Sequence, residues 1–383
     1  MDLFLFDGIE EDCGVRGILS KDNTQILRTV VRFAETQGVT ENSLREYIAV
    51  LLANHKSILS DIACSGGKIG DDLYRVAIMD MEQIYKKLFS MPMKYSPSGN
   101  DPGFCEEYKK SVCSLTESDD AKALLNGLIE HYRRLGCGIT AKYTAFKYDD
   151  GTLSGISKVD YQSFDKLVGL EYQKNILIDN TKAFVEGKKA NNVLLFGDRG
   201  TGKSSSVKAL LDMFAKDGLR LVEVPKTSIS KIPSLTEELA GTPHKYILFL
   251  DDLSFEPSDT EYKLLKVAME GQVSAHSDNV LIYATSNRRH LIKETMDDRK
   301  GSDFHVNDNI QETMSLSERF GISLVFSSPN QKEYLNIVKA MLADHDIEMN
   351  GEIEKQAVVW QMNYGTKSGR CAKQFVANYV SKN

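Results

Sequence analysis

The chain has 383 residues, which is long enough for about two or three domains that each bury a core of their own. Hydrophobic residues make up 42% of the sequence and charged residues 26%, a composition that indicates a soluble globular protein and excludes a fibrous or largely disordered one. The net charge of -7 argues against broad, non-specific attraction to nucleic acid or anionic lipid, although a local basic patch stays compatible with it.

The cysteines and the N-terminal residues indicate the cellular compartment. The six cysteines are widely spaced and form no C-x-x-C pair, so we expect reduced thiols and neither a zinc site nor a disulfide framework. The first residues, MDLFLFDGIEEDCG, are acidic where a secretory signal would be basic, and no apolar run reaches the length of a membrane span. We therefore expect a cytoplasmic protein without membrane insertion.

The first part of the chain is predicted to be helical. Between residues 22 and 134, apolar residues such as Ala77 and Met81 recur at helical spacing, which lines one face of a helix for core packing. Residues 91–103 are rich in Pro, Gly and Ser and are expected to form a loop. We predict an N-terminal, mostly helical domain over residues 1–135.

The second part of the chain alternates between strand-like and helical stretches. Residues 136–163 form a β-like connector, with Asp150-Gly151 as a candidate hairpin turn. Because the apolar runs that follow are continuous, they indicate strands covered on both faces, as in a parallel sheet between helices. We predict an α/β domain over residues 164–329 and a C-terminal helical domain over residues 330–383. The strand-like runs are residues 191–196, 219–224, 246–250, 279–286 and 322–328.

The first of these runs leads into a phosphate-binding motif. Residues 197–204, GDRGTGKS, fit the pattern G-x-x-x-x-G-K-[ST] between a predicted strand and a predicted helix. The glycines allow backbone N–H groups to turn toward phosphate oxygens, Lys203 is expected to reach the β- and γ-phosphates, and Ser204 to bind Mg²⁺. The alternative is a glycine turn with an incidental lysine. The candidate nucleotide-binding residues here are Gly197, Asp198, Arg199, Gly200, Thr201, Gly202, Lys203, Ser204 and Ser205.

Polar residues end two further strand-like runs. Residues 246–252, YILFLDD, finish on two carboxylates, and we expect Asp251 to hold Mg²⁺ and Asp252 to orient or deprotonate water. Asp252 also fits the acidic first turn of a helix. Asn287 ends the run 279–286 and is a candidate to hydrogen-bond the attacking water or the γ-phosphate, with a turn-forming asparagine as the alternative.

Two arginine-containing segments follow. Arg319, in SLSERFG at residues 315–321, is either a helix-end cation or a residue that completes another subunit's site. Arg288 and Arg289 lie directly after Asn287, and they fit solvated or acid-paired side chains better than contacts to a neighbour or a bound strand.

The order of these motifs resembles that of AAA+ ATPases, and more closely that of the bacterial AAA+ family known as domain of unknown function 815. The resemblance covers most of residues 136–383 and is weaker over the first 130 residues. The segments that carry it are residues 136–146, 164–211, 247–256, 279–291, 315–321 and 368–376.

The resemblance implies roles for individual residues. Val168 and Gly169 fall in the element that holds adenine, and Asn287 matches the sensor 1 position. Arg370 matches the sensor 2 arginine of a helical lid, formed by residues 330–383, and Arg319 matches the arginine finger that reaches a neighbouring subunit. ATP and Mg²⁺ are the implied cofactors, and a homo-oligomeric ring, with a hexamer as one candidate size, is the implied assembly.

The resemblance leaves the client unknown and several functions open. We favour an ATPase that hydrolyses ATP between subunits to remodel or load a macromolecular client, a protein in the first instance. Many AAA+ motors have Glu where this chain has Asp252, so slow or partner-stimulated hydrolysis is expected. The alternatives are an ATP-gated binding or scaffold module with little turnover, an initiator- or helicase-loader-like protein acting on nucleic acid, and, least favoured, a small-molecule kinase.

Overall fold

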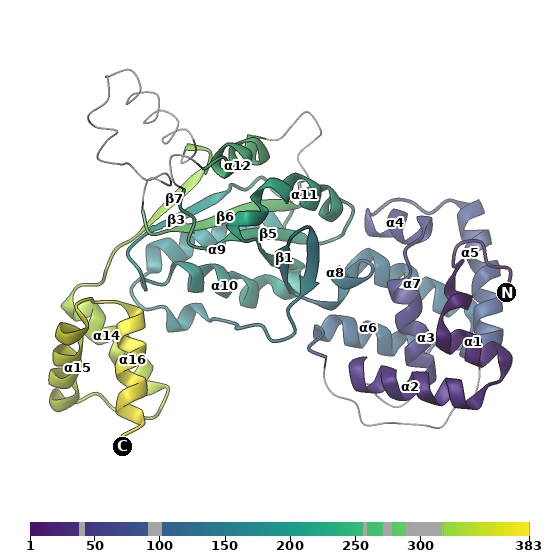
Figure 1. The fold of residues 1–383 in the computed structure, drawn as a ribbon, viewed down its shortest axis with the longest axis horizontal. Coiled ribbons are helices and arrows are strands. Elements are labelled where there is room, and N and C mark those ends of the chain that lie inside the picture. Colours follow the sequence, from purple (N-terminus) through teal and green to yellow (C-terminus); the bar gives the residue numbers. More distant parts are fainter. Residues whose placement is uncertain are drawn as a thin grey trace. The chain divides into compact units, whose positions relative to one another are not determined.

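The computed structural model describes residues 1–37, 43–90, 102–255, 259–270, 278–288, 291, 316 and 318–382. The chain divides into two compact units (Figure 1). This division is coarser than the four predicted domains, whose boundaries stay a prediction. The N-terminal unit comprises Met1–Phe146, Ser154–Val159 and Gly241–His244, and the C-terminal unit comprises Lys147–Leu153, Asp160–Ala240 and Lys245–Asn383.

The N-terminal unit is built from helices, as predicted. Local capping explains where they begin: the Asp12 carboxylate accepts hydrogen bonds from the amides of Gly14 (2.8 Å) and Val15 (3.2 Å), which have no partner within the helix. In the described residues the helices are η1 (Ile9–Glu11), α1 (Cys13–Ser20), α2 (Asn23–Gln37), α3 (Ser43–Asn54), α4 (Ile58–Cys64), α5 (Asp71–Ile84), the π-helical turn η2 (Tyr85–Phe89), α6 (Glu106–Thr116), α7 (Ala121–Leu135) and α8 (Ile139–Lys142).

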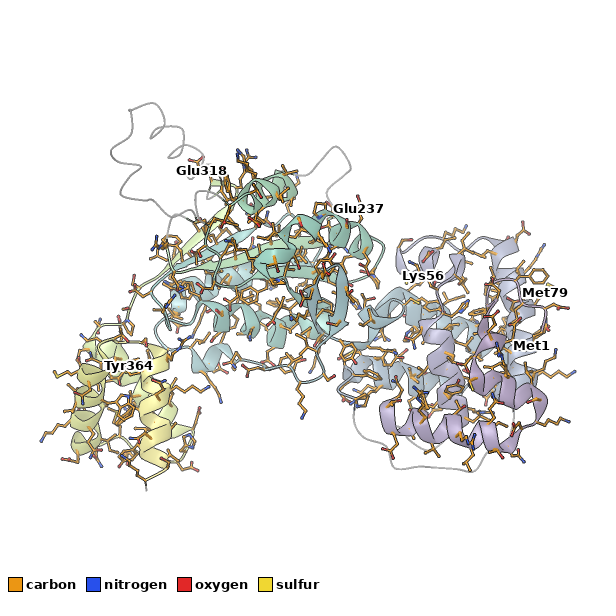
Figure 2. All side chains as sticks on the ribbon, in the orientation of Figure 1. Met1, Lys56, Met79, Glu237, Glu318 and Tyr364 are labelled. Atoms are coloured by element: carbon orange, nitrogen blue, oxygen red, sulfur yellow. The ribbon has the colours of Figure 1, made fainter. Side chains whose placement is uncertain are left out.

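Helix α5 shows how the apolar stripe packs. Ala77 and Met81 are fully buried in one core with Leu128 of α7. Met79, two residues before Met81 and labelled in Figure 2, is 53% exposed. One face of α5 therefore points into the core and the other toward solvent, as the helical spacing predicted.

Lys147–Leu153 of the C-terminal unit belong to a hairpin of β1 (Ala145–Asp149) and β2 (Thr152–Gly155). Its turn residues Asp150 and Gly151 have φ values of 46° and 85°, the left-handed geometry that a two-residue hairpin loop requires. The Asp150 carboxylate accepts a hydrogen bond from Lys231 Nζ at 2.6 Å. The predicted Asp-Gly turn is confirmed.

In the described residues seven strands form one sheet, in the order β2-β1-β4-β5-β6-β3-β7. Helices α9 and α10 lie together on one face, with α11 and α12 on the other (Figure 1). The remaining strands are β3 (Val193–Gly197), β4 (Leu219–Glu223), β5 (Lys245–Leu250), β6 (Val280–Ser286) and β7 (Ile322–Phe326). The helices of this part are η3 (Phe164–Lys166), α9 (Glu171–Val185), α10 (Lys203–Phe214), η4 (Ala215–Asp217), η5 (Lys226–Lys231), α11 (Ile232–Ala240) and α12 (Glu261–Glu270).

Five neighbouring strands of the sheet, β4, β5, β6, β3 and β7, run parallel to one another. Strands β3 and β5 are buried along almost their whole length, because helices cover both faces of the sheet. The predicted fold class, a parallel sheet between helices with a helical N-terminal part and a C-terminal helical segment, is confirmed.

The last part of the chain forms a helical bundle with a core of its own. Its helices are α14 (Gln331–Ala343), α15 (Gly351–Tyr364) and α16 (Gly369–Val380), and Tyr334, Ala357 and Phe375 contribute one buried residue from each. In the part of the chain that the structure describes, every helix is too short or too polar to cross a membrane.

Candidate functional site

The sheet register brings the ends of three strands to the same level. Ala284 of β6 pairs with Leu250 of β5 on one side and with Leu194 of β3 on the other. Counting forward from these pairs, Asp251 lies level with Thr285, and Gly197 lies level with Asn287. The phosphate loop, the two carboxylates and the asparagine therefore meet at the carboxyl edge of the sheet, where open α/β folds bind ligands.

The loop that leaves β3 has the backbone that an anion site requires. Gly197 has φ +136°, and a Cβ atom there would lie 2.1 Å from the Phe326 carbonyl oxygen, so only glycine fits. Gly202, with φ +99°, precedes the first residue of α10. The loop thus ends on the N-terminus of a helix, where free N–H groups and the helix dipole favour negative charge.

Lys203 lies at the centre of this loop and is only 7% exposed. Its Nζ donates hydrogen bonds to the carbonyl oxygens of Gly197 (2.8 Å) and Asp198 (2.6 Å) and to Asn287 Oδ1 (3.4 Å). Burial lowers the pKa of the Lys203 ammonium from its ordinary value, and the Asp198 carboxylate opposes this effect. A phosphate group beside Nζ would stabilise the charged form of this lysine, which burial disfavours by removing water.

Asp251 is bound by two hydroxyl groups. Ser204 Oγ and Thr285 Oγ1 both donate to Asp251 Oδ1, each at 2.6 Å. A serine hydroxyl beside a carboxylate is the pair that holds Mg²⁺ in phosphate-loop enzymes. Thr285 is missed by the sequence analysis, since its contact depends on the pairing of β5 with β6.

The backbone of Asp252 has a φ of 52°, in the left-handed region that residues other than glycine rarely adopt. Its amide donates to Thr285 Oγ1 at 2.9 Å, and its carboxylate oxygen Oδ1 accepts a short hydrogen bond from Asn287 Nδ2. Unusual backbone geometry of this kind is concentrated at functional sites. The two candidates for handling water are thus in direct contact with each other.

These groups line a cavity of about 1280 Å³ within the C-terminal unit, which exceeds the size typical of small-molecule pockets. The predicted site residues on its wall are Val168, Gly169, Arg199, Gly200, Thr201, Gly202, Lys203, Ser204, Ser205, Asp251, Asp252, Asn287 and Arg370. Apolar side chains contribute another part of the wall, among them Leu167, Ile337, Met341 and Val376. The cavity therefore combines a polar end suited to phosphates with an apolar part.

The remaining predicted residues lie elsewhere. Gly197 and Asp198 are absent from the cavity wall, although their carbonyl oxygens accept from Lys203. Arg319 is exposed, lies just before β7 and is also absent from the wall. Its position is next to Glu318, which Figure 2 labels.

Two of the features predicted from the sequence fall outside the described residues. These are Arg289 and residues 91–101 of the loop predicted over residues 91–103. Arg288 is described, and its amide donates to Ser286 Oγ at 3.2 Å.

The phosphate loop lies close to the segment after β7 and to the start of α16, and the sequence does not indicate this proximity. Asp198 Oδ2 accepts from the amide (3.1 Å) and from the hydroxyl (2.6 Å) of Ser328, which follows β7. These hydrogen bonds hold the pKa of the Asp198 carboxyl below its ordinary value. At Gly200, an added Cβ would lie 3.1 Å from Ser368 Oγ at the start of α16. The segment after β7 and the start of α16 therefore both approach the phosphate loop.

A comparison with known families decides the membership of the chain. Residues 141–383, well over half of the chain, match the family described as Protein of unknown function (DUF815). The chain belongs to this family. The matched range includes every predicted site residue from Val168 to Arg370, and the fold is the parallel sheet between helices that the resemblance implied.

Two examples illustrate the solved structures that are similar to more than half of this chain. Thermotoga maritima RuvB, described as a Holliday junction branch migration motor, is 16% identical, with 57% of this chain and 72% of that chain covered and a TM-score of 0.35. The Aeropyrum pernix Orc1 protein in complex with DNA is also 16% identical, with 56% and 61% covered and a TM-score of 0.40. No curated protein matches the sequence. The functional interpretation therefore rests on the site's own residues.

Proposed function

We propose that this chain is a cytoplasmic AAA+ ATPase that binds ATP with Mg²⁺ and hydrolyses it to remodel or load a macromolecular client. One observation carries the proposal: a buried lysine, a serine hydroxyl, two consecutive carboxylates and an asparagine meet at one edge of the sheet and line one cavity. Each of these groups has a defined task in phosphoryl transfer to water.

The residues present fit both ATP and Mg²⁺. The Ser204 hydroxyl and the Asp251 carboxylate are oxygen ligands 2.6 Å apart, the hard donors that Mg²⁺ prefers. When bound, Mg²⁺ neutralises charge on the phosphate oxygens and keeps the β- and γ-phosphates in a fixed orientation. Lys203 supplies a second positive charge, and the Val168-Gly169 side of the cavity, with its apolar wall, suits the adenine base.

Asp252 and Asn287 are the residues that we assign to the attacking water. Asp252 is placed to accept a proton or to orient the water, and Asn287 is placed to donate to the water or to the γ-phosphate. In the structure their side chains bind each other, which joins the two groups that we assign to the water. Asp252, shorter than the Glu that many AAA+ motors carry here, supports slow or partner-stimulated hydrolysis.

In this proposal Arg370 acts in the site of its own chain and Arg319 acts in the site of a neighbouring subunit. Arg370 lines the cavity of its own chain and is assigned to the phosphates as a sensor of nucleotide. Arg319 lies away from that wall, which supports a role in the site of a neighbouring copy in a ring, with a hexamer as one candidate. The helical domain over residues 1–135, joined by the connector over residues 136–163, is the part that we expect hydrolysis to move.

Two substitutions test the proposal. Lys203→Ala removes the buried cation and should weaken ATP binding by about tenfold or more, whereas Asp252→Asn should leave binding within about threefold and reduce kcat by about a hundredfold. Phosphate release and the binding of a fluorescent ATP analogue measure the two effects separately. If Asp252→Asn hydrolyses ATP at the parent rate, the assignment of Asp252 is wrong.

The second candidate function is an ATP-gated binding module with little turnover, and the Asn287–Asp252 hydrogen bond favours it because it ties one donor and one acceptor of the water-handling pair to each other. A nucleic-acid client, as for initiators or helicase loaders, belongs to this candidate as well. A pull-down with the Asp252→Asn form in ATP, followed by ATPase assays with the retained partner, separates the two functions. Turnover that stays low with the partner present supports gating, and salt-dependent DNA binding supports a nucleic-acid client.

A further inference from the structure

Thr285 occupies a central position in the site although it is almost fully buried, with 1% of its surface exposed. It lies near the end of β6, level with Asp251, which directly follows β5. Its hydroxyl donates to Asp251 Oδ1 at 2.6 Å and accepts from the amide of Asp252 at 2.9 Å. A single hydroxyl therefore contacts both of the consecutive acids.

The contact with Asp252 stabilises an unfavourable backbone conformation. Asp252 has φ 52°, and a left-handed conformation at a residue other than glycine persists only where its surroundings hold it. Thr285 holds this turn twice, since its hydroxyl accepts from Asp252 N and its carbonyl oxygen accepts from Leu253 N at 2.7 Å. The direction in which the Asp252 carboxylate points thus depends on Thr285.

The contact with Asp251 orients the carboxylate that we assign to Mg²⁺. Two hydroxyl donors, Ser204 and Thr285, both bind Oδ1. Ser204 is itself an assigned ligand of the ion, whereas Thr285 is buried and has no such task. Thr285 is therefore the donor that can hold the Asp251 carboxylate in one rotamer whether or not the ion is present.

We propose that Thr285 is a positioning residue that fixes the Mg²⁺ carboxylate Asp251 and the water-handling carboxylate Asp252 through one hydroxyl. This inference rests on the proposed ATPase function. It differs from a packing role for a buried β-branched residue, because packing needs the shape of the side chain and positioning needs its hydroxyl.

Isosteric substitution separates the two roles. Thr285→Val keeps the shape and removes the hydroxyl, whereas Thr285→Ser keeps the hydroxyl and removes the methyl group. Ser286→Ala is a matched control, since Ser286 is also 1% exposed and its hydroxyl accepts from the amide of Arg288. Each full-length variant is titrated with Mg²⁺ at a fixed concentration of a fluorescent ATP analogue, and its kcat and KM for ATP are measured at saturating Mg²⁺.

The expected result is a change in metal dependence that follows the hydroxyl. Loss of a group that orients a metal ligand typically lowers metal affinity or activity by about 10- to 100-fold. Thr285→Val should therefore raise the half-saturating Mg²⁺ concentration about tenfold and lower kcat about tenfold. Its KM for ATP and its metal-free binding of the analogue should stay within about twofold, because Lys203 is untouched. Thr285→Ser and Ser286→Ala should both resemble the parent.

Two results would overturn the inference. A folded Thr285→Val with the parent's Mg²⁺ dependence means that the residue only packs, and a folded Thr285→Ser that loses the dependence means that the hydroxyl is not the group that matters. If Thr285→Val does not fold, Thr285→Ala carries the same expectation. A parent that binds the analogue but shows neither Mg²⁺ dependence nor hydrolysis overturns the proposed function as well, which distinguishes the two failures.

Discussion

Asp198 introduces a negative charge into a loop whose backbone is arranged for anions. The two hydrogen bonds from Ser328, at 3.1 Å from the amide and 2.6 Å from the hydroxyl, hold the carboxylate toward the segment that follows β7. The carboxyl is ionised more readily as a result, since its pKa is lowered. The charge stays compatible with phosphate binding only while Ser328 keeps it in this orientation.

Removal of the Ser328 hydroxyl should therefore weaken nucleotide binding. In Ser328→Ala only the backbone amide still donates to the Asp198 carboxylate. The carboxylate then becomes free to turn toward the phosphates. The loss of one such hydrogen bond is worth about 1 kcal/mol, or about fivefold in the Kd for an ATP analogue. Asp198→Asn in the same chain removes the charge and should restore binding. Equal Kd values for the parent and Ser328→Ala would show that Ser328 has no part in nucleotide binding.

At the scale of single elements, some features could be predicted from local sequence and others could not. The continuous apolar run at residues 246–250 predicted β5 (Lys245–Leu250), and the Asp-Gly turn predicted the hairpin, because both signals are local. The position of β3 between β6 and β7 is set by packing of distant segments, which no local pattern encodes. Thr285 and Ser328 were missed for this reason, since each acquires its partner only through the strand register.

Helices α6 and α7 are joined by a buried polar contact with a consequence for acid stability. His131 of α7 is 2% exposed, and its Nδ1 shares a hydrogen bond of 2.8 Å with Ser111 Oγ of α6. Burial lowers the pKa of His131 from 6.5 to about 4. Between these two pH values the unfolded chain binds a proton that the folded chain does not, so stability falls as the pH falls from 6.5 to about 4.

The size of this effect follows from the shift. The difference between pKa values of 6.5 and about 4 corresponds to a loss of about 3 kcal/mol in the free energy of unfolding. This loss is absent above pH 6.5 and complete below pH 4. His131→Gln has no titrating ring and should flatten the pH dependence of urea unfolding over this range, as measured by circular dichroism of the helices. His345→Gln, at an exposed histidine, should keep the parent's slope. A His131→Gln variant with the parent's slope would exclude His131 as the cause.

At the scale of the whole molecule, the family match and the two compact units divide the chain differently. The match begins at residue 141 and covers the complete candidate site, whereas the N-terminal unit has its own helical core and lies almost wholly outside the match. In the proposed ATPase, the nucleotide chemistry would belong to the matched part, and the N-terminal helices would be available to contact the client. Assembly into a ring would then place several such N-terminal units together.

The role of Arg319 is a property of that assembly and is tested by mixing subunits. If Arg319 acts in a neighbour's site, Arg319→Ala removes the positive charge that such a finger brings to the transition state, a loss of about 10³-fold or more in turnover. Lys203→Ala subunits lose their own nucleotide site and keep Arg319. A random mixture in equal amounts should regain about a quarter of the parent's active sites, because each active site needs an intact phosphate loop beside an intact arginine.

The control for the mixture is a Lys203→Ala subunit that also carries Arg319→Ala. Mixed with Arg319→Ala subunits, it supplies neither group and should recover no phosphate release above that of Arg319→Ala alone. If the first mixture also recovers nothing while size-exclusion chromatography in ATP shows that the variants assemble together, Arg319 does not act across an interface. Its exposed position before β7 then fits the helix-end cation, which contributes less than about 1 kcal/mol through the helix dipole.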